Sequence, residues 1–574
     1  MLLNIKKNKN MRKLIECVPN FSEGRDLSVI KQITDVIESV EGVRLLDVDP
    51  GFATNRTVVT FVGEPEAVVE AAFQAAKKAT EVIDMSKHKG EHPRFGAMDV
   101  CPLVPISNIT MEETAEYARK LAKRMGEELQ YPIYCYENAA FKEERRNLAN
   151  VRQGEYEGLI EKLANPNWKP DFGPDKFVPK VGATAVSARN FLIAINYNLN
   201  TTSTRRANAI AFDVREKGRP KREGNKLTGK IIRDENGEPI NIPGTLKGTK
   251  AIGWFIEEYG IAQVSMNITD IEVCPVHIAF DEISEKARLR GVRVSGAEIV
   301  GLVPKKVLID AGKHYLTKQK RSLGVSESEL IKIAVKSMGL DDLKPFNPNE
   351  KIIEYLLASE LKIKKLVDMT CTDFANETAS ESPAPGGGSI SAYMAALGAA
   401  LGTMVANLSS HKQGWDDRWE EFSVWAEKGQ KIKDELLVLV DEDTNSFNKI
   451  MDALALPKGT DEEKRIRKAE LQLATKYAAE VPFHTMQKAM EVLPLCAAMA
   501  DIGNPSSVSD AGVGALAATA AVRGAFLNVK INAADIEDKK WVEDIMKSAA
   551  ELEKQAMREQ DEIMKKVISV IDGK

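Results

Sequence analysis

The chain has 574 residues, of which 43% are hydrophobic and 28% charged, an ordinary composition for a soluble globular protein. Its length suggests about three or four domains. A net charge of −5 and an isoelectric point near 6.0 argue against nucleic acid as the main partner. No apolar run approaches the ~20 residues of a bilayer-spanning helix, so we expect no membrane partner. Six cysteines without a Cys-x-x-Cys pair, behind an N-terminus that has no apolar signal region, favour a cytoplasmic location.

The N-terminal part alternates between strand and helix patterns. Short runs rich in Val, Leu and Thr predict strands, and stretches with a 3.6-residue apolar period predict helices. In chain order we predict strand 14–18, helix 27–37, strands 43–48 and 57–62, helix 65–83, strand 100–105, helix 111–129 and strand 132–136. The first six follow the order β-α-β-β-α-β of a ferredoxin-like unit.

A second α/β unit follows, and the chain then changes character. Its predicted elements are strand 191–199, helix 252–259, strand 262–268, helix 279–290 and strand 292–295. Residues 217–247 are rich in Lys, Arg, Gly and Asn, with a hairpin-type turn at 235–238, and predict a surface insertion. From about residue 366 onward, helical spacing dominates, as in 390–408, 419–440, 464–481 and 541–571.

The predicted fold is therefore multidomain. An N-terminal α+β part contains two ferredoxin-like α/β subdomains, at 11–188 and at 189–340 with the insertion. A linker at 341–365 precedes an all-α helical bundle at 366–574. Two architectures in one chain suggest two activities.

Two of the six histidines lie in the stretch His-Lys-Gly-Glu-His-Pro-Arg at 88–94. His88-x-x-Glu91-His92 matches the spelling of a zinc peptidase motif, which requires both histidines on one helical face. Gly90 and Pro93 oppose a helix at this place, so we expect no metal. The stretch is then either an acid–base loop, because histidine exchanges protons near neutral pH, or a solvated charged loop.

Two features of the C-terminal part are candidate sites. Gly386, Gly387 and Gly388 precede a helix expected to open near Ser391, an arrangement that binds phosphate or carboxylate but also occurs in plain connectors. The helix that follows is rich in small residues, which suits a tight bundle or a dimer contact.

Asp441-Glu442-Asp443 follows an apolar run on a predicted helix that continues to residue 454. We take Val440 and Phe447 to mark its packed face, on which Asp443 also lies. A carboxylate near an apolar face has a raised pKa and can act as a general acid. The alternative is an exposed acidic patch.

An irregular stretch at 173–182 is shaped by proline and glycine, and it offers one aromatic ring and two lysines. It could hold a flat anionic ligand, or it could be an interdomain linker.

These stretches together resemble a known family. Residues 16–24, 54–58, 88–94 and 99–102 resemble glutamate formiminotransferase. Residues 384–389 with the small-residue helix, and residues 439–443, resemble formiminotetrahydrofolate cyclodeaminase. From about residue 12 to the last helix, the chain is similar to the bifunctional formiminotransferase-cyclodeaminases of histidine breakdown. The insertion and the first ten residues depart from the pattern.

The resemblance implies two consecutive reactions. The formimino group of N-formimino-L-glutamate passes to N5 of tetrahydrofolate, which releases glutamate. N10 then attacks the formimino carbon, which closes the ring to 5,10-methenyltetrahydrofolate and expels ammonia.

The resemblance also implies site residues. His92 matches the transferase histidine, and Asp443 matches the cyclodeaminase carboxylate. Asn20, Asp49 and Arg56, expected in strand-end loops, are candidates for substrate contacts, as are the three glycines; a guanidinium suits a substrate carboxylate. The folate-binding stretch consists of Gly173, Pro174, Asp175, Lys176, Phe177, Val178, Pro179, Lys180, Val181 and Gly182.

Tetrahydrofolate, in polyglutamylated form, is then a co-substrate, without metal, flavin or nicotinamide, and the family implies a homo-oligomer. Two alternatives for the C-terminal domain stay open. It could be a methenyltetrahydrofolate cyclohydrolase, because a related all-α family works on the same folate ring. It could also be a non-catalytic helical oligomerisation scaffold.

Overall fold

The structure is a computed structural model, and it describes residues 13–52, 54–90, 94–224, 228–358 and 365–573. The chain forms two compact units: Met1–Leu308 with Val335–Glu360, and Ile309–Ala334 with Leu361–Lys574. Residues 309–334, which the sequence analysis placed in the second α/β subdomain, therefore pack with the helical unit.

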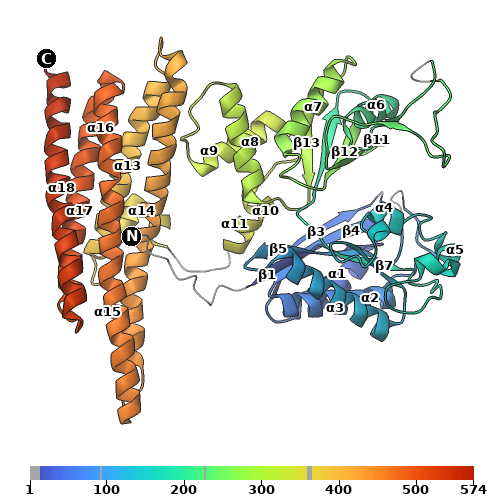
Figure 1. The fold of residues 1–574 in the computed structure, drawn as a ribbon, viewed down its shortest axis with the longest axis horizontal. Helices are drawn as coiled ribbons and strands as arrows, with labels where there is room; N and C mark the ends of the chain where they lie inside the picture. Colours follow the sequence, from blue (N-terminus) through green and yellow to red (C-terminus); the bar gives the residue numbers. More distant parts are fainter. Residues whose placement is uncertain (1–12, 53, 91–93, 225–227, 359–364, 574) are drawn as a thin grey trace. The chain divides into compact units, whose positions relative to one another are not determined.

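The larger sheet of the first unit is formed by the N-terminal strands (Figure 1). These are β1 (Leu14–Cys17), β2 (Asn20–Phe21), β3 (Val43–Gly51), β4 (Arg56–Gly63), β5 (Met98–Ser107), β6 (Ile133–Glu137) and β7 (Thr184–Ala188). β1 and β2 share one position between β4 and β5, and β3 lies beyond β4, all antiparallel. This is the predicted ferredoxin-like arrangement, and β7 and β6 extend it in parallel from β5.

Three amphipathic helices, α1 (Leu27–Glu38), α2 (Pro65–Val82) and α3 (Met111–Leu129), cover one face of this sheet (Figure 1). Asp26 caps α1, and Thr110 forms a capping box with Glu113 at the start of α3. Over residues 56–59 of β4, partly buried and buried residues alternate, because successive side chains point to opposite faces. Arg56 and Val58 therefore belong to the face away from the helices.

A second sheet has the order β11-β12-β8-β13, with antiparallel neighbours. Its elements are β8 (Ile193–Leu199), α6 (Thr204–Val214), β11 (Thr249–Ile256), β12 (Ile261–Ile268), α7 (Val276–Arg288) and β13 (Val294–Val300). In chain order they repeat the β-α-β-β-α-β pattern, so the second ferredoxin-like subdomain is confirmed.

The helix predicted at 252–259 is wrong, because most of this stretch belongs to strand β11. Its residues alternate between buried and exposed, as Ala251 and Gly253 are buried while Ile252 is 51% exposed. A short apolar run does not by itself separate strand from helix. A Cβ on Gly253 would lie 2.7 Å from that of Ala207, so α6, which the sequence analysis did not identify, packs directly on this strand.

The insertion carries a small sheet of β9 (Arg219–Pro220) and β10 (Asn241–Ile242), and most of its described residues are exposed or partly exposed. Gly237, with φ of +80°, lies in the turn predicted at 235–238.

Further helices are α8 (Lys305–Lys318), α9 (Glu327–Met338), α10 (Pro348–Lys351) and α11 (Ile353–Ala358). The last two fall in the stretch predicted as a linker, where Ile352 is buried and forms a β-bridge with Val303.

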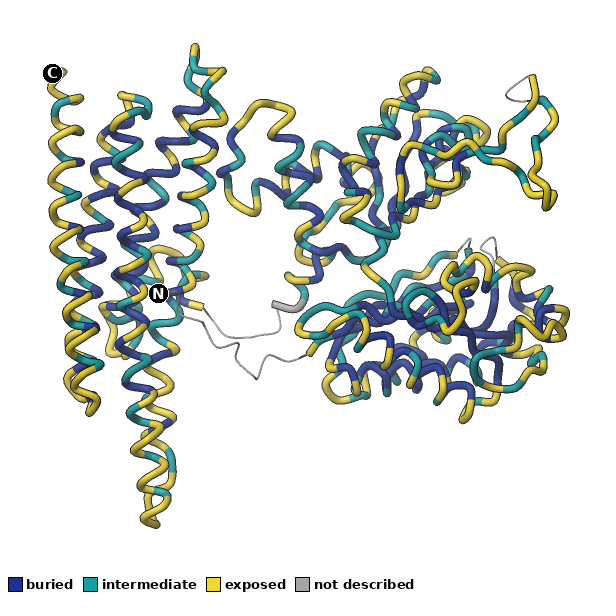
Figure 2. The backbone as a smooth tube through the Cα atoms, viewed as in Figure 1, coloured by how far each residue is buried: buried dark blue, intermediate teal, exposed yellow. Residues whose placement is uncertain are grey.

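Between 365 and 573, the described part of the second unit contains only helices, as predicted. They are α12 (Cys371–Thr378), α13 (Gly387–Ser410), α14 (Trp419–Ala455), α15 (Asp461–Met490), α16 (Val492–Ile502), α17 (Val508–Ala533) and α18 (Lys539–Ile571). α13 and α15 each pack against both α14 and α17, and α18 packs on α17. Buried residues lie along these contacts, whereas the last turns of α14 and the first turns of α15 are largely exposed (Figure 2).

The small residues of α13 allow the close packing that their pattern predicted. A Cβ on Gly398 would lie 2.7 Å from the carbonyl oxygen of Gly514 in α17. α13 and Pro505–Ala533 are also long and apolar enough to cross a membrane by length and composition alone, so the prediction that no apolar run approaches that length is wrong. Half or more of the most apolar window of each is buried inside this unit.

Candidate active sites

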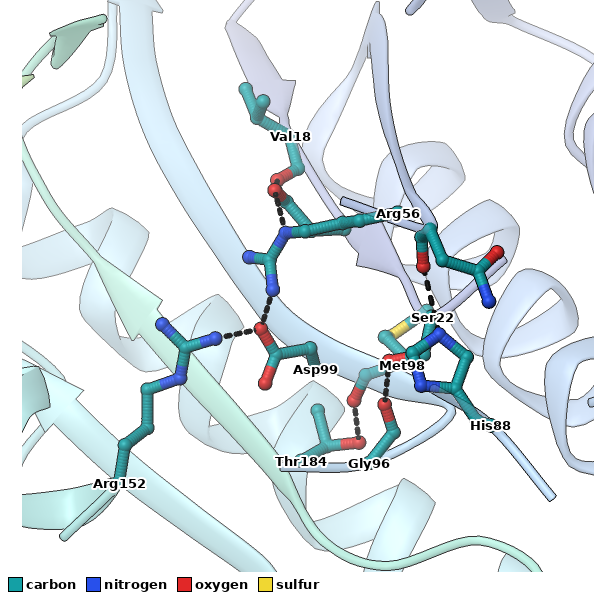
Figure 3. Close-up of polar contacts among 11 residues, drawn as sticks. Val18, Ser22, Arg56, His88, Gly96, Met98, Asp99, Arg152 and Thr184 are labelled. Atoms are coloured by element: carbon teal, nitrogen blue, oxygen red, sulfur yellow. Dashed lines mark hydrogen bonds and ion pairs between the residues drawn. The ribbon is translucent and has the colours of Figure 1, made fainter. Parts of the chain in front are cut away.

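A buried carboxylate on the open face of the first sheet binds two arginines. Asp99 is fully buried, and its Oδ2 accepts hydrogen bonds from the guanidinium groups of Arg56 and Arg152, which approach from two sides (Figure 3). Arg56 Nε also donates to Asn20 Oδ1 at 3.0 Å. Burial lowers the pKa of Arg56, and Asp99 partly offsets this, but an arginine remains charged in proteins. Two positively charged guanidinium groups therefore meet at one buried carboxylate on this face of the sheet.

The structure brings the predicted substrate residues together. Asn20, Asp49 and Arg56 lie in strands β2, β3 and β4, so their expected placement in strand-end loops is wrong. Val58 pairs with both Asn20 and Asp49, and directly opposed residues project from the same face of a sheet. Arg56 is two residues from Val58 in the same strand, so it projects from that face too.

The first histidine of the 88–94 stretch has a structural environment. His88 is 8% exposed, and its Nε2 lies 2.8 Å from the carbonyl oxygen of Asn55. Asn55 has φ of +48°, and its side-chain amide donates to the carbonyl of Lys89 at 2.9 Å. Burial lowers the pKa of His88, so the neutral ring is favoured. His88 thus ties this loop to the 54–58 motif, whereas His92 lies outside the described residues and its acid–base role stays a prediction.

Glycines allow the three N-terminal motifs to contact one another. A Cβ on Gly24 would lie 2.5 Å from the backbone nitrogen of Arg56, and one on Gly90 would lie 2.9 Å from the Cβ of Asn55. Gly24 N donates to Asn55 Oδ1 at 3.0 Å. Stretches that are 30 or more positions apart in the sequence therefore form one wall of the site.

The predicted folate-binding stretch, 173–182, lies against the same loop. The guanidinium of Arg94 is 4.9 Å from the ring centre of Tyr156, whose ring is 5.4 Å from that of Phe177. The Tyr156 hydroxyl donates to the carbonyl of Pro179 at 2.6 Å. The stretch is therefore held in place by these contacts and is not a free linker, and most of its residues are exposed or partly exposed.

The second site is a carboxylate at the start of α13. Asp443 Oδ2 accepts hydrogen bonds from the backbone nitrogen of Ser389 at 2.8 Å and from its hydroxyl at 3.0 Å. A Cβ on Gly388 would lie 2.5 Å from Asp443 Cγ. Burial raises the pKa of Asp443, and the two hydrogen bonds partly offset the rise. The prediction of a carboxyl with a raised pKa is confirmed in direction.

The two neighbouring acids have other partners. Asp441 Oδ1 accepts from the backbone nitrogen of Leu366 at 2.6 Å, and Glu442 accepts from the hydroxyl of Tyr477. Phe447 is 40% exposed, so the prediction that it lies on the packed face of the helix is wrong. Asp443 is partly buried instead by the start of α13, which comes from a different part of the chain.

The glycine-rich loop presents its first-turn backbone to this acid. α13 starts at Gly387, earlier than expected, with Gly386 as an extended cap without a side chain. This helix start was predicted to bind a phosphate or carboxylate, and the carboxylate that it binds here is that of Asp443 in the same chain. An anion is stabilised at a helix N-terminus. Contacts of the three glycines with a substrate stay a prediction.

Arg152 and Ser389 were not predicted as site residues. Ser389 is part of the quoted glycine-rich motif, so its position could have suggested a role. Arg152 lies in no motif and meets Asp99 only through the fold. Within the described ranges, no three His, Cys, Asp or Glu side chains gather as a metal site, and Glu91 and His92 lie outside those ranges.

Comparisons with known proteins cover all three parts of the chain. Family models match at 14–189 (formiminotransferase domain, N-terminal subdomain), 194–358 (formiminotransferase domain) and 370–551 (formiminotransferase-cyclodeaminase). The formimidoyltransferase-cyclodeaminase of Gallus gallus is 45% identical over 92% of this chain and 94% of its own length. The glutamate formimidoyltransferase of Streptococcus pyogenes serotype M1 is 44% identical over 53% of this chain and 94% of its own length. The methenyltetrahydrofolate cyclohydrolase of Methylorubrum extorquens is 38% identical over 31% of this chain and 86% of its own length.

Proposed function

The chain belongs to the formimidoyltransferase-cyclodeaminase family, and we propose that it catalyses two successive reactions on a folate. It transfers the formimino group of N-formimino-L-glutamate to N5 of tetrahydrofolate, and it then cyclises the product to 5,10-methenyltetrahydrofolate with release of ammonia. The observation that carries this proposal is that the chain has two chemically different sites in two separate compact units. One contains the arginines bound to Asp99, and the other contains the Asp443 carboxyl at the start of α13.

In the transferase step, the positive cluster around Arg56 holds a carboxylate of formiminoglutamate, and the 173–182 stretch holds the folate. Attack of N5 on the formimino carbon requires a proton to move from one nitrogen to another. We assign that transfer to His92, because a histidine both accepts and donates protons near neutral pH. His88 is unsuited to it, since its Nε2 is already engaged by a backbone carbonyl.

In the cyclodeaminase step, Asp443 protonates the departing nitrogen. Ammonia leaves far more readily than the amide anion, so the step requires an acid, and a carboxyl with a raised pKa keeps its proton closer to neutral pH. Ser389 orients the carboxyl toward the start of α13. The folate ring would then bind near the solvent-exposed side of the Asp443 carboxyl.

A cyclohydrolase is the second candidate for the helical unit, because the cyclohydrolase relative aligns with about a third of the chain. Such an enzyme adds water to the methenyl bridge. The two assignments differ in one product: the cyclodeaminase releases ammonia from 5-formiminotetrahydrofolate, and the cyclohydrolase does not.

We further propose that the enzyme acts in histidine degradation in the cytoplasm, with polyglutamylated tetrahydrofolate as co-substrate and without metal, flavin or nicotinamide. We also propose a homo-oligomer. Exposed apolar side chains on the helical unit, such as Leu527 at 66%, support a contact between copies.

The test is a paired assay on wild type, His92→Ala and Asp443→Asn, with formiminoglutamate and tetrahydrofolate as substrates. Glutamate, ammonia and the absorbance of methenyltetrahydrofolate are measured separately, and Asp452→Asn, an exposed acid on the same helix, is the matched control. We expect His92→Ala to abolish glutamate release, and Asp443→Asn to release glutamate with little ammonia. If both variants match the wild type, both assignments are wrong.

A further inference from the structure

Asn528 of α17 lies over the bare backbone at the start of α13. A Cβ on Gly387 would lie 3.2 Å from Asn528 Nδ2 and 3.5 Å from its Oδ1. A Cβ on the next residue, Gly388, would instead lie 2.5 Å from Asp443 Cγ. Consecutive Cα atoms are about 3.8 Å apart, so the amide of Asn528 and the carboxyl of Asp443 flank one peptide unit from two different helices.

The amide of Asn528 has a fixed orientation. Its Nδ2 donates to the carbonyl oxygen of Gly524 at 2.9 Å, one turn earlier in α17. This turn packs against α13, since a Cβ on Gly524 would lie 2.5 Å from Ser391 Oγ. The reversed amide would set two carbonyl oxygens against each other, so Oδ1 is the atom that faces away from Gly524. Among the described residues, Oδ1 accepts no hydrogen bond, and Asn528 is only partly buried.

The departing nitrogen of the second reaction requires two different partners. Once N10 has bonded to the formimino carbon, this nitrogen carries two N–H groups and one lone pair. The lone pair must face the proton of Asp443, because the carbon–nitrogen bond breaks as the nitrogen takes that proton and leaves as ammonia. One N–H group then points away from Asp443 and requires an acceptor. A neutral amide oxygen is suited to this place, because it accepts the hydrogen bond without competing for the proton of the acid.

We propose that Asn528 Oδ1 binds an N–H of the formimino group and orients the nitrogen lone pair toward Asp443. The proposal rests on the proposed cyclodeaminase reaction. Asn528 then determines which departing group the second site accepts: an unsubstituted nitrogen supplies the N–H, whereas a nitrogen that carries two methyl groups does not.

The test compares the cyclisation of 5-formiminotetrahydrofolate with that of its N,N-dimethyl derivative, whose departing nitrogen has no N–H. The absorbance of methenyltetrahydrofolate follows both reactions, after subtraction of the uncatalysed rate, and no glutamate is added, so the transferase step cannot run backward. The variants are Asn528→Leu, which has a similar branched shape without an acceptor, and Asn528→Ala.

The matched control is Lys530→Leu. Lys530 is exposed and lies two positions later in α17, so it projects from another side of the helix. Glutamate release from formiminoglutamate and tetrahydrofolate reports on the first unit in each preparation.

Asn528→Leu should lower kcat/KM for the parent substrate roughly tenfold, since one hydrogen bond is lost, and should change the value for the dimethyl derivative less than about twofold. The preference for the parent therefore falls about tenfold, whereas Lys530→Leu keeps the wild-type preference. If both Asn528 variants keep it too, the proposal is overturned even when the rates fall, because structural damage lowers both rates alike. If no enzyme cyclises the dimethyl derivative, its inhibition constant replaces kcat/KM in the same comparison.

Failure of the proposed function has a different outcome. If the wild type releases no ammonia from 5-formiminotetrahydrofolate, the cyclodeaminase assignment fails. Calorimetric titration of the full chain with this folate then tests the contact alone. A tenfold or larger loss of affinity at one of the folate sites in Asn528→Leu supports the contact, and equal affinity, or no binding to the wild type, overturns it.

Discussion

Replacing Gly388 by alanine should displace the carboxyl of Asp443 and abolish most of the ammonia-releasing activity. A Cβ at this position would lie 2.5 Å from Asp443 Cγ and 2.7 Å from Oδ2, whereas ordinary contacts begin at 3.4 Å. The carboxyl group must therefore move by about 1 Å, the displacement that costs on the order of 100-fold in rate when a reacting group is misplaced. Overpacking of this kind also costs about 1–3 kcal/mol of stability.

The assay follows ammonia release from 5-formiminotetrahydrofolate and glutamate release from formiminoglutamate on the same preparation. We expect the first rate to fall about 100-fold and the second to stay within about twofold, because Gly388 lies in the helical unit. Gly459→Ala is the control, since a Cβ there meets at 3.2 Å the flexible carboxyl end of Glu463. Ammonia release at the wild-type rate from a folded Gly388→Ala enzyme would refute the argument that this glycine fixes the position of the acid.

Three further predictions concern titration and stability. Ser389→Ala removes the hydroxyl hydrogen bond that lowers the pKa of Asp443 and keeps the one from the backbone N–H, so the alkaline limb of ammonia release should move to higher pH. Ser391→Ala, whose hydroxyl bonds within α13, should leave the limb in place, and an unchanged limb in Ser389→Ala would exclude Asp443 as the titrating acid. Burial raises the pKa of Glu16 to about 7, so its protonated form stabilises the fold below about pH 4.5 and this contribution, about 3 kcal/mol, is lost as the pH rises through 7. Relative to wild type, Glu16→Gln should therefore gain stability in urea unfolding between pH 5 and pH 8, and a constant difference would contradict the raised pKa. Asp99→Asn should lower the free energy of unfolding of the first unit by about 3–5 kcal/mol in urea titrations, because two guanidinium groups lose their buried carboxylate. A loss below about 1 kcal/mol would show that this acid does not hold the two arginines in place.

Local sequence was sufficient for most elements and for the identity of the site motifs. The predicted and observed ranges of α3 agree because its cap, its period and the start of the next strand are all encoded within about 20 residues. The glycine-rich loop before α13 was visible for the same reason. Strand β11 was misread because its exposed Ile252 belongs to a face whose neighbours are set by other segments.

The composition of the two sites, by contrast, was decided by tertiary structure. Ser389 and Asp443 are 54 positions apart, and Arg152 and Asp99 are 53 apart. Neither pair has a local signal, because a hydrogen bond or ion pair between distant segments depends on how the helices and strands pack. The sequence by itself determined which kinds of residue were available for acid–base chemistry and carboxylate binding. Only the folded chain determined which acid is buried against which donor, and hence which pKa is raised and where the positive charge is concentrated.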